Sequence, residues 1–168
     1  MSNYISEDLK DSILKITLNN PANQNTLSLE IINDLKELIV TADNNQEVKV
    51  IILSSSGKVF SAGHNLKEIQ THRNDSDQGL RFFTKLINSC SELMLTIINN
   101  SKPVIAEVDG VATAAGCQLV ASCDLAYASE KSKFATPGVN IGLFCSTPMV
   151  ALSRSIKNKH AMEMLLTG

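Results

Sequence analysis

The chain has 168 residues, of which 43% are hydrophobic and 19% charged, and 15 basic and 17 acidic side chains give a formal net charge of -2. This composition is typical of a single soluble domain over residues 1–168, and the charge gives no electrostatic reason to expect nucleic acid or an anionic membrane as a partner. Because no apolar run has the length of a membrane span and residues 1–12 carry no signal or transit pattern, we expect a cytoplasmic protein.

The first part of the chain predicts a strand, a turn region, a helix and a second strand. Residues 13–18 alternate as a strand, and residues 19–25 are dense in turn-forming types. A helix begins at Ser28, since apolar residues recur there at spacings of three and four, and Asn44-Asn45 ends it. The apolar run 48–53 is the next strand.

The middle of the chain predicts two helices separated by a polar loop. Residues 60–67 read as a backbone loop that enters a short helix at Asn65. Residues 71–78 are polar and without periodicity, which indicates a surface loop. A longer helix covers about 79–98.

The second half repeats this order. A strand at 104–108 leads through small residues into a helix at 114–122, and another strand follows at 124–128. Residues 147–166 read as two helical pieces that are broken near Lys157. The alternation of strands and helices predicts an α/β core with crossover connections and buried apolar strands.

Two loops of small residues are the most informative feature for function. Each follows an apolar strand and enters a helix, one within 60–67 and the other within 109–117. Free backbone N–H groups can converge at such places and hold a carbonyl oxygen that gains negative charge. The alternative is that the small residues only permit tight turns. The small residues are Ala62, Gly63, Ala114, Ala115 and Gly116.

Several motifs resemble the crotonase superfamily, which is the enoyl-CoA hydratase/isomerase family. The motifs are Phe60 to Lys67, Lys102 to Ala106, Ala114 to Cys117 and Cys123-Asp124. Within the family, His64 and the run from Pro137 to Pro148 are most similar to the enoyl-CoA hydratase domain-containing protein 3 group. The resemblance implies an α/β, crotonase-like ββα spiral core that binds the thioester of an acyl-CoA and assembles as a homo-oligomer, a trimer or a trimer-based assembly.

The resemblance also assigns roles to residues of the first loop. By position, the backbone N–H groups of His64 and Ala115 are the two oxyanion donors, while the side chain of His64 can simply point to solvent. Coenzyme A enters as part of the substrate and not as a separate cofactor, and no metal is expected. Lys67 can pair with phosphate or merely be solvated. The residues implied in coenzyme A binding are Ala62, Gly63, Asn65, Leu66 and Lys67.

The chain departs from the family where the proton-transfer groups are expected. Hydratases of this family use two glutamates, and the matching positions here hold Gln118 and Gly138. An amide cannot accept a proton at neutral pH, and glycine has no side chain. Some relatives with glycine at the second position keep an acid further along, but the corresponding residue here is Cys145. Standard hydratase activity is therefore in doubt.

Other candidates for proton transfer are less specific. Glu107 is a buried structural acid or an edge charge, Asp109 opens a turn, and Glu68 faces outward from its short helix. Cys117 and Cys145 are more typical of packing residues than of nucleophiles. The four cysteines contain no C-x-x-C pair, so we interpret them as buried, reduced thiols.

Compared with the family, the chain is C-terminally shortened and lacks the usual last helices, so apolar side chains of its last segment should be exposed. The candidates are Leu152, Ile156, Met162, Met164, Leu165 and Leu166. Two functions stay open. One is an enzyme of the lyase or isomerase type that stabilises an enolate of an acyl-CoA, as in fatty acid metabolism. The other is a non-catalytic acyl-CoA-binding or regulatory protein on the same scaffold.

Overall fold

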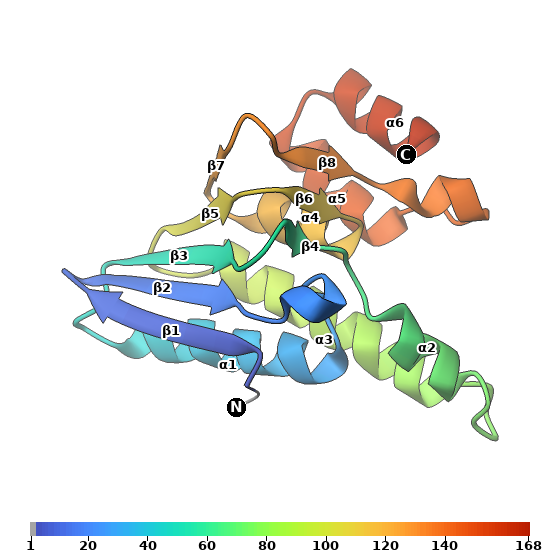
Figure 1. Ribbon diagram of the computed structural model, residues 1–168, viewed down its shortest axis with the longest axis horizontal. Helices are drawn as coiled ribbons and strands as arrows, with labels where there is room; N and C mark the ends of the chain where they lie inside the picture. The colour runs from blue at the N-terminus through green and yellow to red at the C-terminus, as the bar shows by residue number, and fades with distance from the viewer. Residues whose placement is uncertain (1–2) are drawn as a thin grey trace.

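Two β-sheets organise residues 3–168, the part of the chain that the computed structural model describes (Figure 1). The five-stranded sheet has the order β1-β2-β3-β5-β7, and its strands are Ile5–Lys10, Ile13–Leu18, Val50–Ser55, Val104–Val108 and Leu125–Ala128. The three-stranded sheet has the order β4-β6-β8, and its strands are Val59–Ser61, Val111–Thr113 and Lys133–Ala135. Only the β1–β2 pair is antiparallel among the described strand pairs.

The chain winds as a spiral of ββα turns. From β3 onward, one strand of each turn joins the larger sheet, the next joins the smaller sheet, and a helix follows, whereas β1 and β2 both join the larger sheet. The pair β3 and β4 leads to α2 (Leu66–His72), and β5 and β6 lead to α4 (Ala115–Ser122). The pair β7 and β8 leads to the short 3-10 helix η2 (Pro137–Ile141) and to α5 (Ser146–Ser155). The predicted α/β class with a crotonase-like ββα spiral is confirmed.

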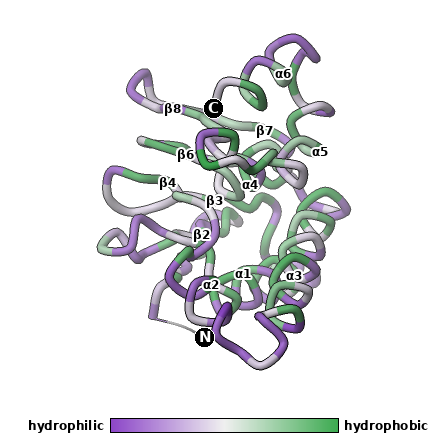
Figure 2. Tube along the Cα trace, turned by 90° about the vertical axis from the view of Figure 1, so that its right-hand side faces the viewer, coloured by the Kyte–Doolittle hydropathy of each residue, from purple (hydrophilic) through white to green (hydrophobic). Residues whose placement is uncertain are grey.

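Two long helices cover the buried face of the larger sheet. Helices α1 (Leu29–Asn44) and α3 (Leu80–Ile98) lie side by side (Figure 2). Helix α1 begins at Ser28 because the Ser28 Oγ accepts a hydrogen bond from the N–H of Ile31. Its buried side chains are Ile31, Ile32, Leu35, Leu38, Ile39 and Ala42. Together with buried residues of β2, β3 and β5 they form the main hydrophobic core.

A second, smaller core lies at the carboxyl end. Helix α6 (Asn158–Thr167) follows α5, and Leu152 and Leu165 pack there against Cys117 of α4. The expectation of exposed apolar side chains is thus wrong for Leu152 and Leu165, which are 3% and 1% exposed. Packing between α4, α5 and α6 buries them. It is correct for three of the other candidates, Ile156, Met162 and Leu166.

The elements with clear periodicity were predicted close to their observed bounds, but six short or polar elements were not, among them the 3-10 helix η1 (Pro21–Asn23). Strand β1 was missed because five of its six residues are exposed, so it shows no apolar alternation. The three strands of the smaller sheet have three residues each, and η2 has five, too few to show a period. Within residues 3–168, no helix combines the length and hydropathy needed to cross a membrane.

Candidate functional site

The two small-residue loops lie in direct contact, although about fifty residues separate them in the chain. Gly116 in the first turn of α4 packs against Ser61 at the end of β4, and a Cβ added to Gly116 would lie 2.7 Å from the Cβ of Ser61. The carbonyl oxygen of Ser61 would lie closer still. The absence of a side chain at Gly116 therefore sets how closely the second loop approaches the first.

Gly63 makes a second close approach between the loops. Its φ of +85° favours glycine, and a Cβ added there would lie 3.0 Å from the Cβ of Ala114 and 3.1 Å from the backbone N of Ala115. Since the peptide N of His64 is bonded to Gly63, the N–H groups of His64 and Ala115 lie near one another. These are the two groups that the sequence predicts as oxyanion donors.

Both N–H groups lack a hydrogen-bond partner within residues 3–168. Ala115 is the first residue of α4, whose first hydrogen bond runs from the N–H of Gln118 to the carbonyl of Ala114. On either side of His64, the N–H of Gly63 donates to the Ser61 Oγ and the N–H of Asn65 donates to the Leu27 carbonyl. Two unpaired donors at the start of a helix can hold an oxygen that carries negative charge.

The predicted coenzyme A residues gather at one hollow of about 340 Å³. Residues of the loop 60–67 and of the turn at 22–26 line this hollow, and the lining includes Ala62, His64, Asn65, Leu66 and Lys67. Gly63, the remaining predicted residue, packs against the other loop instead. The Asn65 Oδ1 accepts from the N–H groups of Lys67 and Glu68 and so caps α2. The Lys67 side chain is exposed.

His64 does not point to solvent. Both of its ring nitrogens are buried and have no hydrogen-bond partner among the described residues. Burial lowers the pKa of the His64 imidazole below 6.5, opposed by the nearby Leu27 carbonyl, which favours the protonated ring. The effect of burial is the larger one, because that carbonyl already accepts the Asn65 N–H at 3.2 Å. The ring is therefore neutral at neutral pH.

Gln118 lies one turn beyond Ala115 on α4 and is 7% exposed. It does not line the hollow beside His64 but borders a separate cavity of about 300 Å³ between α3, α4 and α5. Its Oε1 is buried without a hydrogen-bond partner in the described structure. A buried amide oxygen without a donor destabilises the folded chain unless a ligand or water supplies one.

Gly138 lies in η2, where no space exists for a side chain. A Cβ added there would lie 2.7 Å from both the Cys145 Sγ and the Leu143 carbonyl oxygen. A carboxylate at position 138 would therefore require the segment that follows η2 to move. Cys145 itself is half-buried and packs on the smaller core, and no carboxylate replaces the missing acid there.

The other carboxylates have structural roles. Glu68 was predicted to face outward, and this is wrong, because its Oε2 accepts a hydrogen bond from the N–H of Leu29 at the start of α1. Glu107 is an exposed charge and not a buried acid, and it pairs with Lys15 at 2.8 Å. The Asp109 Oδ1 accepts a hydrogen bond from the hydroxyl of Ser129, as expected for an acid in a turn.

The cysteines are free thiols, two of them buried and two half-buried. Burial is the main cause that raises the pKa of Cys117 to about 11; a hydrogen bond with the Ala135 backbone opposes this rise, and the nearby Cys145 adds to it. Such a thiol is a poor nucleophile at neutral pH. In the described part of the chain, no group of three or more His, Cys, Asp or Glu side chains is placed to hold a metal ion.

Two further features shape the site: the sequence indicated Ala114 only as a small residue of the second loop, and it did not indicate the role of Asn25. Ala114 adopts φ 50° and ψ −120° immediately before α4, which is unusual for a residue with a side chain, and strain of this kind often marks a functional turn. Asn25 is 1% exposed, and its amide donates to the carbonyls of Ser56 and Val59. It thereby fixes the turn at 22–26 against the loop that leads into β4. The dense polar run 19–25 was the only signal for it.

Comparison with known proteins agrees with the family resemblance predicted from the sequence. Residues 8–168 match the family model for enoyl-CoA hydratase/isomerase. The chain is 56% identical over 156 residues to an enoyl-CoA hydratase domain-containing protein 3, mitochondrial, of Danio rerio. The aligned residues cover 93% of this chain and 52% of that protein. It thus spans about half the length of the curated relatives it matches.

Solved structures agree. The crystal structure of human enoyl Coenzyme A hydratase domain-containing protein 3 matches with a TM-score of 0.90 and 50% identity, over 99% of this chain and 64% of that one. An enoyl-CoA hydratase/isomerase family protein from Silicibacter pomeroyi matches with a TM-score of 0.91 and 43% identity, over 98% and 68%.

The expectation of a cytoplasmic protein is wrong, since the relatives from Danio rerio, Rattus norvegicus and Homo sapiens are all named mitochondrial. The prediction rested on residues 1–12 carrying no targeting pattern, and a presequence that is removed leaves no such pattern.

Proposed function

Because the chain belongs to the enoyl-CoA hydratase/isomerase family, we propose that it binds an acyl-CoA thioester, with the thioester oxygen between the N–H groups of His64 and Ala115. The observation that carries this proposal is the contact of the two loops through Gly63 and Gly116, which brings two unpaired donors together. Backbone amides that are held rigidly in this way need no rearrangement when charge develops on the oxygen.

The expected strength follows from the number of donors. A net hydrogen bond contributes about 1 kcal/mol, so two donors make a thioester bind about 30-fold more tightly than a ligand without the oxygen. An enolate gains more, since removal of one such donor typically costs about 3 to 4 kcal/mol in the transition state. Coenzyme A is part of this ligand, and the hollow lined by Asn65, Leu66 and Lys67 is the proposed place for it.

Hydration that depends on two glutamates is not part of the proposal. Gln118 offers an amide, and position 138 has no space for an acid. General acid and base groups contribute about 10²- to 10⁴-fold each, so the loss of both leaves little hydration. This favours a non-catalytic acyl-CoA-binding or regulatory protein as the second candidate, beside a lyase or isomerase that uses another base.

The first experiment compares two ligands that differ in one oxygen. Calorimetric titration of the 168-residue chain with butanoyl-CoA and with S-butyl-CoA, a thioether without the carbonyl, isolates the contribution of the two N–H groups. We expect the thioester to bind about 30-fold more tightly. Equal affinities would refute the assignment of His64 and Ala115. Free coenzyme A serves as the reference for binding in the hollow alone.

A pair of variants tests the same point from the side of the protein. Gly63→Ala places a methyl group 3.1 Å from the Ala115 N at a residue with φ +85°, so it should reduce the preference for the thioester. Gly142→Ala is the matched control, because Gly142 has φ +77° but no atom within 4 Å of an added Cβ. The two variants share the backbone strain, and only the first disturbs the donors.

The question of catalysis is tested by Gln118→Glu. This change restores one carboxyl group at the border of the cavity without the collision that Gly138→Glu would cause. If the chain is a binder that lacks only its proton-transfer groups, the variant should hydrate crotonyl-CoA faster than the parent, measured by loss of absorbance of the enoyl thioester. A folded variant that binds crotonyl-CoA but shows no gain would count against Gln118 as a former catalytic position.

Location and assembly complete the proposal. The names of the relatives make the mitochondrion the expected compartment. We also expect a homo-oligomer, either a trimer or a trimer-based assembly. Light scattering coupled to size-exclusion chromatography measures the mass of the assembly directly, and a monomer of 18.2 kDa would contradict this part of the proposal.

A further inference from the structure

The cavity beside Gln118 has apolar walls and a polar rim. It measures about 300 Å³, near the lower end of the range for small-molecule sites. Helices α3 and α5 line it with Ile87, Leu95, Ile98 and Val150, each of which is at least 41% exposed. Exposed apolar side chains that gather at one cavity favour an apolar ligand there.

One charged side chain lines this cavity, that of Arg154 in the last turn of α5. It takes part in none of the ion pairs or side-chain hydrogen bonds found within residues 3–168. Among the residues that the structure describes, the cavity lining contains no carboxylate. The lining is therefore mainly apolar and includes one unpaired cation and the Gln118 amide.

Helix α4 relates this cation to the proposed thioester site. The Ser155 Oγ, next to Arg154 in the chain, donates a hydrogen bond of 2.7 Å to the Ala121 carbonyl. Ala115 carries the proposed thioester donor, Gln118 follows one turn later, and Ala121 follows after another turn. With a rise of about 1.5 Å per residue, Ala115 and Ala121 are about 9 Å apart along the helix axis. A short acyl chain can span this separation.

We propose that the cavity between α3, α4 and α5 receives the acyl group of the ligand and that this group ends in a carboxylate, which the Arg154 guanidinium binds. The ligand class is thus an acyl-CoA with a second acid group at the far end of a short chain. The inference rests on the proposed function, because the thioester must lie at Ala115 for the chain to reach the cavity. A guanidinium binds a carboxylate with two parallel hydrogen bonds, which makes the pairing specific.

Arg154 also stabilises α5 simply by its position, since a cation near a helix carboxyl end interacts favourably with the helix dipole. That role predicts a change in stability but no change in ligand preference. The two roles are therefore separated by comparing ligands within each variant.

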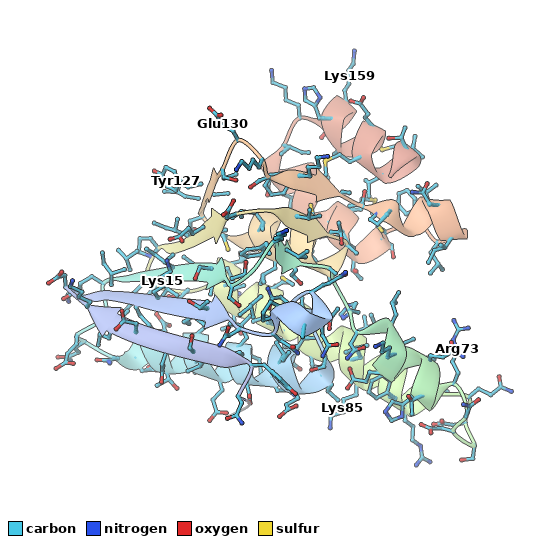
Figure 3. All side chains as sticks on the ribbon, in the orientation of Figure 1. Lys15, Arg73, Lys85, Tyr127, Glu130 and Lys159 are labelled. Carbon is cyan, nitrogen blue, oxygen red and sulfur yellow. The ribbon has the colours of Figure 1, made fainter. Side chains whose placement is uncertain are left out.

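The test measures the ratio of affinities for hexanedioyl-CoA and hexanoyl-CoA, which differ only in the terminal acid. Arg154→Gln should lower this ratio about tenfold. Arg154→Lys, which keeps the charge but not the planar fork, should lower it less. The matched control is Lys159→Gln in α6, where the side chain projects away from the molecule (Figure 3) and does not line the cavity. It removes the same charge and should leave the ratio unchanged.

Each other outcome overturns the inference. An equal ratio in Arg154→Gln and the parent would show that Arg154 does not bind the acid, and an equal fall in Lys159→Gln would assign the effect to net charge. Binding of free hexanoate that depends on Arg154, without any preference between the two thioesters, would indicate a separate carboxylate site. If butanoyl-CoA and S-butyl-CoA bind equally, the proposed function itself fails, whereas a preference for butanoyl-CoA with no effect of Arg154 leaves that function intact.

Discussion

Replacing Gly116 by alanine tests the contact between the two loops most directly. The added Cβ would lie 2.7 Å from the Cβ of Ser61 and closer still to the Ser61 carbonyl oxygen, whereas ordinary contact begins at 3.4 Å, so the two loops must separate by at least about 0.7 Å. Overpacking of this kind costs about 1 to 3 kcal/mol. Alanine regains about 1 kcal/mol because it favours a helix over glycine. We therefore expect the free energy of unfolding to fall by about 1 kcal/mol.

The free energy lost in thioester binding should be about as large as the free energy lost in stability. Ser61 accepts the N–H of Gly63, and His64 follows directly, so displacement of Ser61 moves one proposed donor away from the other. Loss of one hydrogen bond to a neutral oxygen costs about 1 kcal/mol, which is about fivefold in affinity for the thioester. Affinity for the thioether S-butyl-CoA should change little, because that ligand has no oxygen for the donors.

The assay combines urea unfolding, followed by circular dichroism because the chain has no tryptophan, with calorimetry of both ligands. The reasoning would be refuted if Gly116→Ala unfolds at higher urea concentration than the parent and keeps the full preference for butanoyl-CoA. In that case, alanine would act only through helix propensity, and the loops would not be in the described contact.

Three further predictions concern other parts of the structure. Because burial lowers the pKa of His64 below 6.5, the unfolded chain binds a proton more tightly than the folded chain. The free energy of unfolding should therefore fall as the pH drops through 6.5, by at most about 1.4 kcal/mol per pH unit. It should fall less in His64→Gln, and an equal pH dependence of the two proteins in urea titrations would contradict this. Lys102→Met should reduce the free energy of unfolding by about 1 to 2 kcal/mol, because the Lys102 Nζ donates to two carbonyls at the end of α1. Thermal unfolding measures this, and Lys49→Met is the matched control because the Lys49 side chain is exposed and has no such role. Cys90 and Cys117 should react slowly with iodoacetamide at pH 8, because both are buried and the pKa of each is raised to about 11, and rapid alkylation of the folded chain in mass spectra would argue against their burial.

The sequence predicts the larger elements because their apolar residues are periodic. The spacing in α1 and the continuous apolar run in β3 each mark one buried face, and these elements appear within two residues of the expected positions. The smaller sheet could not be predicted, since each of its strands has three residues and is defined by pairing with strands distant in the chain.

In the candidate site, too, some features could be predicted from the sequence and others could not. The small residues of both loops indicate close backbone approach, and the structure brings Gly63 and Gly116 into contact with the opposite loop. The direction of a side chain is not encoded so locally. Whether His64 turns inward, or Glu68 turns toward the start of α1, depends on the turn at 22–28, which packs beside them only after folding.

The donors of the proposed site belong to the main chain, and this affects how the site tolerates mutation. Exchange of the His64 or Ala115 side chain leaves an N–H in place, so substitutions at these two positions do not by themselves remove a donor. The vulnerable positions are the glycines that keep the loops close, Gly63 and Gly116, whereas the positions expected to hold the proton-transfer groups are those of other residues, Gln118 in α4 and Gly138 in η2. Carbonyl binding and proton transfer thus depend on different residues, so substitutions can remove or add one of these functions and leave the other unchanged.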